Sequence, residues 1–270
     1  MRIAVFQGPQ AGGDVARNLE RLDQVAAEAA AGGARLLICP EMFLTGYAIG
    51  PEAVASLAEP AAGPSAARAA EIAADRGLAL LYGYPERGDD GRIFNAALLV
   101  DRDGRRLANH RKTHLFGAID RDAFSAGEGP PTLAELDGLR LGILICYDVE
   151  FPENVRLLAA EGADFVAVPT ALMEPYDFVA RSLVPTRAYE NQVFLAYANR
   201  CGQEGELLYH GLSCIIGPDG ADLARAGTGE ELLLADLGPA LLAASRPHNT
   251  YLADRRPELY EALATPGKPI

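Results

Sequence analysis

Short apolar runs alternate with amphipathic segments almost throughout the chain. The apolar runs are typical of buried strands, and the Ala-rich segments between them are typical of helices that cover a sheet. Strands are predicted at 2–8, 35–39, 78–84, 96–101, 139–146, 165–169, 193–199, 211–216 and 232–236. Helices are predicted at 16–31, 65–76, 154–161 and from about 176 to 192. This alternation predicts an α/β layered architecture.

Two of these apolar runs end abruptly at groups that can do chemistry. The run 139–146 stops at Cys146, and Pro152 soon opens a predicted helix, so the thiol lies on a strand-to-helix turn. A helix N-terminus can stabilise a thiolate there, although a cysteine beside Ile and Leu is also typical of a purely structural residue. The run 35–39 ends at Glu41 in the same way. Open α/β sheets bind ligands at the carboxyl ends of their strands, so the acid and the thiol are expected to share one site.

Composition narrows the classes of partner. The 270 residues carry 24 Lys and Arg against 37 Asp and Glu, a net charge of −13, which argues against binding nucleic acid or an anionic membrane. No apolar run approaches the roughly 20 residues of a spanning helix, and the N-terminus is too short and too quickly polar for a signal peptide. The four cysteines form no CxxC pair and the four histidines no HExxH pattern, so no metal site is predicted. A reduced, cytoplasmic setting fits this cysteine usage best.

The chain shows no linker and no internal repeat, so residues 1–270 are predicted to form one domain. From about residue 245 the chain is rich in Pro and Arg. This tail is interpreted either as a segment that packs on another subunit or as simple surface disorder.

Three motifs occur in an informative order: PEMFLTGY at 40–47, RKTHLF at 111–116 and CYDVEFPE at 146–153. Together they resemble the nitrilase superfamily of carbon–nitrogen hydrolases, and the resemblance covers almost the whole chain. Shorter landmarks of that family also match, at Tyr82-Gly83, Asn95, Arg187-Ala188, Ala198-Asn199-Arg200 and Gly211-Leu212-Ser213.

The resemblance implies a four-layer αββα sandwich, no cofactor, and a homodimer or higher homo-oligomer. It also implies a catalytic triad of Glu41, Lys112 and Cys146. Cys146 would attack the substrate, Glu41 would serve as general base and then acid, and Lys112 would stay charged and stabilise the thiolate and the oxyanion. The backbone N–H of Tyr147 is the expected second oxyanion donor.

Family members commonly carry a second glutamate eight residues after the lysine, and this chain has Asp120 there. Its side chain is one methylene shorter, and we expect it either to support catalysis or to cap a local turn. Glu128 is a poorer candidate because it lies beyond the segment 124–127.

The sequence around the cysteine resembles the amidase-type branches, which implies hydrolysis of a linear carboxamide to the acid and ammonia. Many of those branches carry an arginine where this chain has Glu150. A negative side chain near the pocket would repel a carboxylate and tolerate neutral or cationic amides, unless Glu150 points to solvent or pairs with Arg156.

An N-carbamoyl amine hydrolase is the main alternative, with an omega-amidase or a nitrilase behind it. A non-catalytic scaffold is the alternative from a different class. Tyr47 and Ala171, with the neighbouring Leu172 and Met173, are the expected lining of the substrate pocket.

Overall fold

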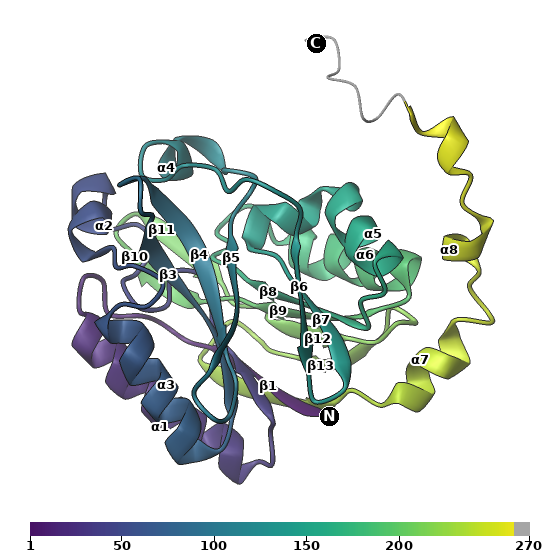
Figure 1. Cartoon of the computed structure of the whole chain (residues 1–270), viewed down its shortest axis with the longest axis horizontal. Helices are drawn as coiled ribbons and strands as arrows, with labels where there is room; N and C mark the ends of the chain where they lie inside the picture. The colour runs from purple at the N-terminus through teal and green to yellow at the C-terminus, as the bar shows by residue number, and fades with distance from the viewer. Residues whose placement is uncertain (262–270) are drawn as a thin grey trace.

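Residues 1–261 are described by a computed structural model, in which two six-stranded β-sheets pack between layers of helices (Figure 1). The strand order is β14-β1-β2-β3-β4-β5 in the first sheet and β13-β12-β9-β8-β7-β6 in the second. The first sheet comprises β1 (Arg2–Gln7), β2 (Leu36–Ile38), β3 (Ala79–Arg87), β4 (Ile93–Val100), β5 (Arg106–Arg111) and β14 (Glu231–Asp236). The second comprises β6 (Thr132–Leu136), β7 (Leu139–Ile143), β8 (Phe165–Pro169), β9 (Phe194–Ala198), β12 (Cys214–Ile216) and β13 (Asp222–Arg225).

The outer face of the first sheet is covered by α1 (Val15–Ala31) and α3 (Pro64–Arg76), and that of the second by α5 (Pro152–Ala160) and α6 (Val184–Asn191) (Figure 1). The other helices are α2 (Pro51–Leu57), α4 (Gly117–Arg121), α7 (Pro239–Ser245) and α8 (Tyr251–Asp254), of which the last two follow the C-terminal arm (Figure 1). Short 3-10 turns occur at Cys146–Glu150 and Pro257–Leu259, and a π-helical turn at Val179–Leu183. A separate hairpin is formed by β10 (Cys201–Glu204) and β11 (Leu207–His210).

Three apolar layers hold this arrangement together. The middle layer joins side chains from both sheets, among them Ile38, Ile143 and Phe194. A second layer packs α1 and α3 against the first sheet, and a third packs α5 and α6 against the second. Central strands buried on both faces explain why the sequence shows apolar runs instead of strict alternation. The predicted αββα sandwich is confirmed.

Several predicted boundaries were wrong for identifiable reasons. The helix predicted from about 176 to 192 is present from Val179 to Asn191, but it begins with a π-helical turn before α6, and Pro185 lies at the start of α6. Strands β5 and β6 were not predicted because β5 is polar and β6 is only partly buried, so neither forms an apolar run. The strand predicted to reach Cys146 ends at Ile143.

Within the tail predicted from about residue 245, residues 249–251 pack on α6 of the same chain. Asn249 Nδ2 donates to the carbonyl of Tyr189 at 3.0 Å, and the rings of Tyr189 and Tyr251 meet edge-to-face at 6.0 Å. Residues 262–270 of this tail lie outside the described residues, and its packing on another subunit stays a prediction. Within residues 1–261, no helix combines the length and apolarity that crossing a membrane requires.

Candidate active site

Three strands deliver the predicted triad to one edge of the sandwich. Glu41 follows β2, Lys112 follows β5, and Cys146 opens the 3-10 turn between β7 and α5. The strands β1, β2 and β3 run parallel, as do β7, β8 and β9, so their carboxyl ends gather together. The site therefore combines groups from both sheets.

Lys112 lies between two carboxylates. Its Nζ donates to Glu41 Oε1 at 2.7 Å and lies 2.7 Å from Asp120 Oδ2, and all three side chains are fully buried. Asn95 Nδ2 donates to the same Glu41 oxygen at 2.6 Å, and the Tyr47 hydroxyl donates to Asp120 Oδ1 at 2.7 Å. A buried charge is tolerable only when it is paired and hydrogen-bonded, and this cluster satisfies that requirement for the ammonium group.

Asp120 has a third partner in addition to Lys112 and Tyr47. Besides meeting Lys112, its Oδ2 accepts the backbone N–H of Phe116 at 2.8 Å, next to the start of α4. Asp120 therefore contacts the lysine and also accepts a backbone N–H beside α4, and its supporting role in catalysis stays a prediction.

The second oxygen of Glu41 is available for proton transfer. Within the described residues, Glu41 Oε2 is buried and has no hydrogen-bond partner. Burial raises the pKa of Glu41 above its usual value, and Asp120 adds to this effect while the charge of Lys112 opposes it. Burial alone would lower the pKa of Lys112, but the negative charges around it, Glu41 foremost, raise that pKa well above the usual value. The lysine thus stays charged.

Cys146 occupies a sharp turn in the backbone. Its φ is 48°, in the left-handed region, and Met42 beside Glu41 has a φ of 50°. Such conformations cost about 1–3 kcal/mol and are characteristic of functional turns. Burial and the charge of Glu41 raise the pKa of the Cys146 thiol, while Lys112, the Thr170 hydroxyl and the backbone N–H of Ala171 lower it. The resting group is therefore a thiol that needs a base.

A tight backbone approach holds the loop of Glu41. A Cβ on Gly83 of β3 would lie 2.3 Å from the backbone nitrogen of Met42 and 2.7 Å from Cα of Glu41. Only glycine fits this contact, which explains the glycine in the family landmark Tyr82-Gly83.

Asp148 ties the turn that carries Cys146 to the strand end that carries Lys112. One carboxylate oxygen accepts the N–H of Ile145 at 3.1 Å, and the other accepts the Thr113 hydroxyl at 2.9 Å and the N–H of His114 at 2.9 Å. The ring Nε2 of His110 lies 3.3 Å from this carboxylate. Burial alone would raise the pKa of Asp148, but the hydrogen bonds with the two histidines lower it below its usual value.

We expect Asp148→Asn to destabilise the fold by about 2–3 kcal/mol, because the amide leaves N–H donors facing an N–H₂ group. A carboxylate with a lowered native pKa stabilises the fold above its unfolded pKa, about 3.9, and loses that contribution as the pH falls further. Urea unfolding should therefore show a constant gap between wild type and variant above about pH 5 and a shrinking gap below about pH 4. Asp89→Asn, at an exposed aspartate, is the control. A gap unchanged at low pH would contradict this interpretation.

The residues predicted to line the substrate pocket lie near the cluster of Glu41, Lys112 and Asp120. Tyr47, Ala171 and Met173 are buried in one apolar cluster with Met42 and Tyr209. The ring of Tyr47 lies 5.9 Å from Lys112 Nζ.

Glu150 and Tyr147 lie in the turn that follows Cys146. Glu150 is partly buried and makes no ion pair among the described residues, so the predicted pairing with Arg156 does not form there. Burial raises the pKa of Glu150, opposed by the charges of Lys112 and Arg187. The Tyr147 ring packs edge-to-face on Phe116 at 5.4 Å.

Sequence reasoning missed several partners of the site. Asn95 was named only as a family landmark, Asp148 appeared only within the motif CYDVEFPE, and Thr170 was not named. Composition also distinguishes Lys112, because Lys112 and Lys268 are the sole lysines of a chain that otherwise uses arginine. A compact ammonium fits between two carboxylates where a planar guanidinium would not.

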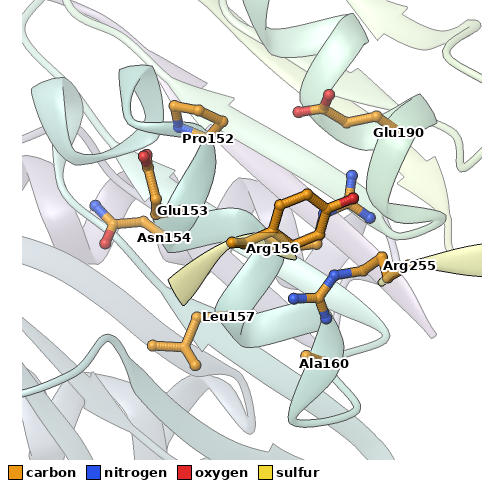
Figure 2. A pocket seen from close by; sticks show the side chains of 9 residues that line it. Pro152, Glu153, Asn154, Arg156, Leu157, Ala160, Glu190 and Arg255 are labelled. Carbon is orange, nitrogen blue, oxygen red and sulfur yellow. The ribbon is translucent and has the colours of Figure 1, made fainter. Parts of the chain in front are cut away.

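A separate hollow lies outside the cluster of Glu41, Lys112 and Cys146. It has a volume of about 560 Å³ and is lined mainly by α5, with Glu190 and the tail residues Arg255 and Tyr260 (Figure 2). None of the three predicted triad residues lines it. In residues 1–261, no group of three or more His, Cys, Asp or Glu side chains is arranged to hold a metal ion.

The fold and the site together have the character of a hydrolase that acts on carbon–nitrogen bonds. Residues 2–247 match the carbon-nitrogen hydrolase family, and the chain belongs to it. It is 56% identical over 264 residues to a Pseudomonas protegens protein called "Hydrolase in pqqF 5'region", covering 98% of this chain and 92% of that protein. It is 37% identical over 258 residues to an (R)-stereoselective amidase of a Pseudomonas species, covering 95% and 92% of the two chains.

Solved structures agree with this assignment. A double mutant of the amidase from Nesterenkonia sp. AN1, in complex with acrylamide, superposes with a TM-score of 0.87 and 40% identity, covering 97% of each chain. Other structures of that amidase hold butyramide, or the acetamide moiety of fluoroacetamide added covalently at the active-site cysteine.

Proposed function

We propose that this protein hydrolyses small, neutral, linear carboxamides to the carboxylic acid and ammonia through a thioester on Cys146. The observation that carries the proposal is the buried cluster in which Lys112 lies 2.7 Å from both Glu41 and Asp120, at the edge where Cys146 is presented. The amide ligands of the Nesterenkonia amidase support the same chemistry.

Acylation begins with a proton transfer. Glu41 Oε2 takes the proton of the Cys146 thiol as the sulfur attacks the amide carbon, and the carbonyl oxygen becomes an oxyanion. The charge of Lys112 and the backbone N–H of Tyr147 stabilise that oxyanion; losing one such donor typically costs about 10²–10³ in rate. Glu41 then gives its proton to the leaving nitrogen, the C–N bond breaks, and ammonia departs from the thioester.

Deacylation repeats the same proton path with water. Glu41 removes a proton from the water molecule as its oxygen attacks the thioester carbon. The C–S bond then breaks, the departing sulfur regains its proton from Glu41, and the acid leaves. Asp120 remains on Lys112 throughout and keeps the ammonium group in place between the two carboxylates.

Two features of the site support a small, neutral acyl group. The predicted lining residues Tyr47, Ala171 and Met173 are all buried, and Cys146 is only 8% exposed, which leaves little room beside the thiol. Glu150 is partly buried four residues after the nucleophile and lacks an ion-pair partner among the described residues. A substrate carboxylate near Glu150 would be repelled.

The proposed selectivity predicts that propionamide is hydrolysed with a higher kcat/KM than succinamate, an amide whose far end carries a carboxylate. In Glu150→Gln this preference should fall on the order of tenfold, because the repulsive charge is removed. Ammonia release from both substrates measures the ratio, and Glu153→Gln, at an exposed glutamate on the outer side of α5, is the matched control. A wild-type enzyme that prefers succinamate would overturn the proposal.

The N-carbamoyl amine alternative rests on the same residue, because Glu150 could meet the ammonium of a cationic substrate. That function would be favoured if N-carbamoylputrescine released both carbon dioxide and ammonia, and if its kcat/KM exceeded that of propionamide. Absence of turnover for every amide and carbamoyl substrate, with Cys146 alkylated no faster than a denatured-chain thiol, would favour a scaffold.

A further inference from the structure

A second buried polar network lies beside the site, on the hairpin formed by β10 and β11. The Glu204 carboxylate accepts the backbone N–H of Tyr47 at 3.1 Å and that of Ala48 at 2.8 Å. It also accepts the Tyr209 hydroxyl at 3.0 Å and pairs with Arg200 Nη1 at 2.8 Å. One side chain of the hairpin thus holds the loop that carries Tyr47.

This network is costly to bury. The Arg200 side chain is only 2% exposed, and its guanidinium group lies 4.5 Å from the centre of the Tyr209 ring. Taking an ion pair out of water usually costs more than its attraction returns, so apolar side chains would hold the loop at least as well. Gly46 leaves room in the loop for this carboxylate. It has a φ of 83°, and a Cβ at this position would lie 2.5 Å from a Glu204 oxygen.

The network connects to the proposed reacting groups through one side chain. Tyr47 is fixed at its backbone N–H by Glu204, and its hydroxyl donates to Asp120 at 2.7 Å. Asp120 in turn lies 2.7 Å from Lys112 Nζ. The tyrosine therefore links a carboxylate outside the cluster to the lysine inside it.

We propose that Glu204 is a positioning residue for the proposed amide hydrolysis: it fixes Tyr47 so that the tyrosine hydroxyl holds Asp120 against Lys112. The inference rests on the proposed function for its effect on turnover, and on geometry alone for its effect on the thiol. Without Glu204 the loop loses two backbone anchors, and the ammonium group is no longer held where it stabilises the Cys146 thiolate.

Glu204→Gln keeps the shape of the side chain but places an N–H₂ group among N–H and O–H donors. We expect kcat to fall by about 10- to 100-fold with KM changed by less than about threefold, the scale of a small misplacement of catalytic groups. The pH midpoint for alkylation of Cys146 by iodoacetamide should rise, because the thiolate loses part of its stabilisation. Glu206→Gln, at an exposed glutamate in the same hairpin, is the matched control.

A double-mutant cycle with Tyr47→Phe identifies the route. If Glu204 acts through Tyr47, its substitution should change kcat and the alkylation midpoint by less than about threefold in the Tyr47→Phe background. An equal effect in both backgrounds would overturn the proposal, as would a lowered melting temperature with kcat and the alkylation midpoint unchanged.

A second variant and a readout that does not need turnover keep the test decisive. If Glu204→Gln does not fold, Tyr209→Phe removes only one hydrogen bond to Glu204 and should move the same readouts in the same direction by a smaller factor. The alkylation midpoint does not depend on amide turnover, so it separates failure of this inference from failure of the proposed function.

Discussion

Cys146→Ala is expected to abolish amide hydrolysis, lowering kcat by at least about 10⁴-fold, because the nucleophile that forms the thioester is gone. The fold should survive, since alanine keeps the Cβ at the left-handed position of φ 48° and removes only a largely buried sulfur. Ammonia release under substrate saturation and a thermal melt measure the two effects.

Cys214→Ala is the matched control, because Cys214 is an equally buried free thiol in β12, outside the site. That variant should retain wild-type turnover. Retention of more than about a tenth of the activity by Cys146→Ala would contradict the assignment of the nucleophile, since loss of a nucleophile normally costs far more.

Lys112→Met is expected to lower both activity and stability. Glu41 and Asp120 would remain buried without the cation that each contacts at 2.7 Å, and breaking a buried pair in this way typically costs about 3–5 kcal/mol. Turnover should fall by about 10³-fold or more, since the thiolate and the oxyanion lose their only nearby positive charge in the cluster.

The stability effect of Lys112→Met should depend on pH in a defined direction. Without the lysine the pKa of Glu41, which burial already raises, rises further above that of the unfolded chain, so the folded variant binds protons more tightly. Its deficit should therefore widen as the pH rises above about 4.3, the pKa of a free glutamate. Urea unfolding at pH 5 and pH 8 measures this difference, and a smaller deficit at pH 8 than at pH 5 would contradict it.

Lys112→Arg provides the matched comparison, since it keeps the positive charge but replaces the compact ammonium with a planar fork. It should recover part of the stability lost in Lys112→Met and little of the activity. Near-wild-type turnover in Lys112→Arg would show that charge alone suffices and that the 2.7 Å contacts of the ammonium are not required.

The apolar runs predicted the central strands because a strand buried on both faces is apolar at nearly every position, as in β8 and β9. The same reasoning missed β5, because most of its residues are polar and only His110 is buried. It also extended the strand before Cys146 too far, since the apolar Leu144 and Ile145 lie between the end of β7 and the 3-10 turn.

The site was only partly visible in the sequence for a related reason. Glu41, Lys112 and Cys146 stand in motifs with a recognisable order, whereas their supporting contacts join distant residues. Asp148 meets Thr113 across 35 positions of the chain, and Glu204 meets Tyr47 across 157. No local pattern encodes such contacts, because they arise only when the two sheets pack together.

The most direct test of the account is to trap the acyl-enzyme. Wild-type protein is mixed with propionamide, quenched in acid within the first turnover, and digested for mass spectrometry of the peptide that contains Cys146. The account predicts that this peptide gains the mass of the propionyl group, bound to Cys146, and that the gain is absent from Cys146→Ala. Continued hydrolysis of propionamide by Cys146→Ala at the wild-type rate, with no adduct on the wild-type peptide, would contradict it.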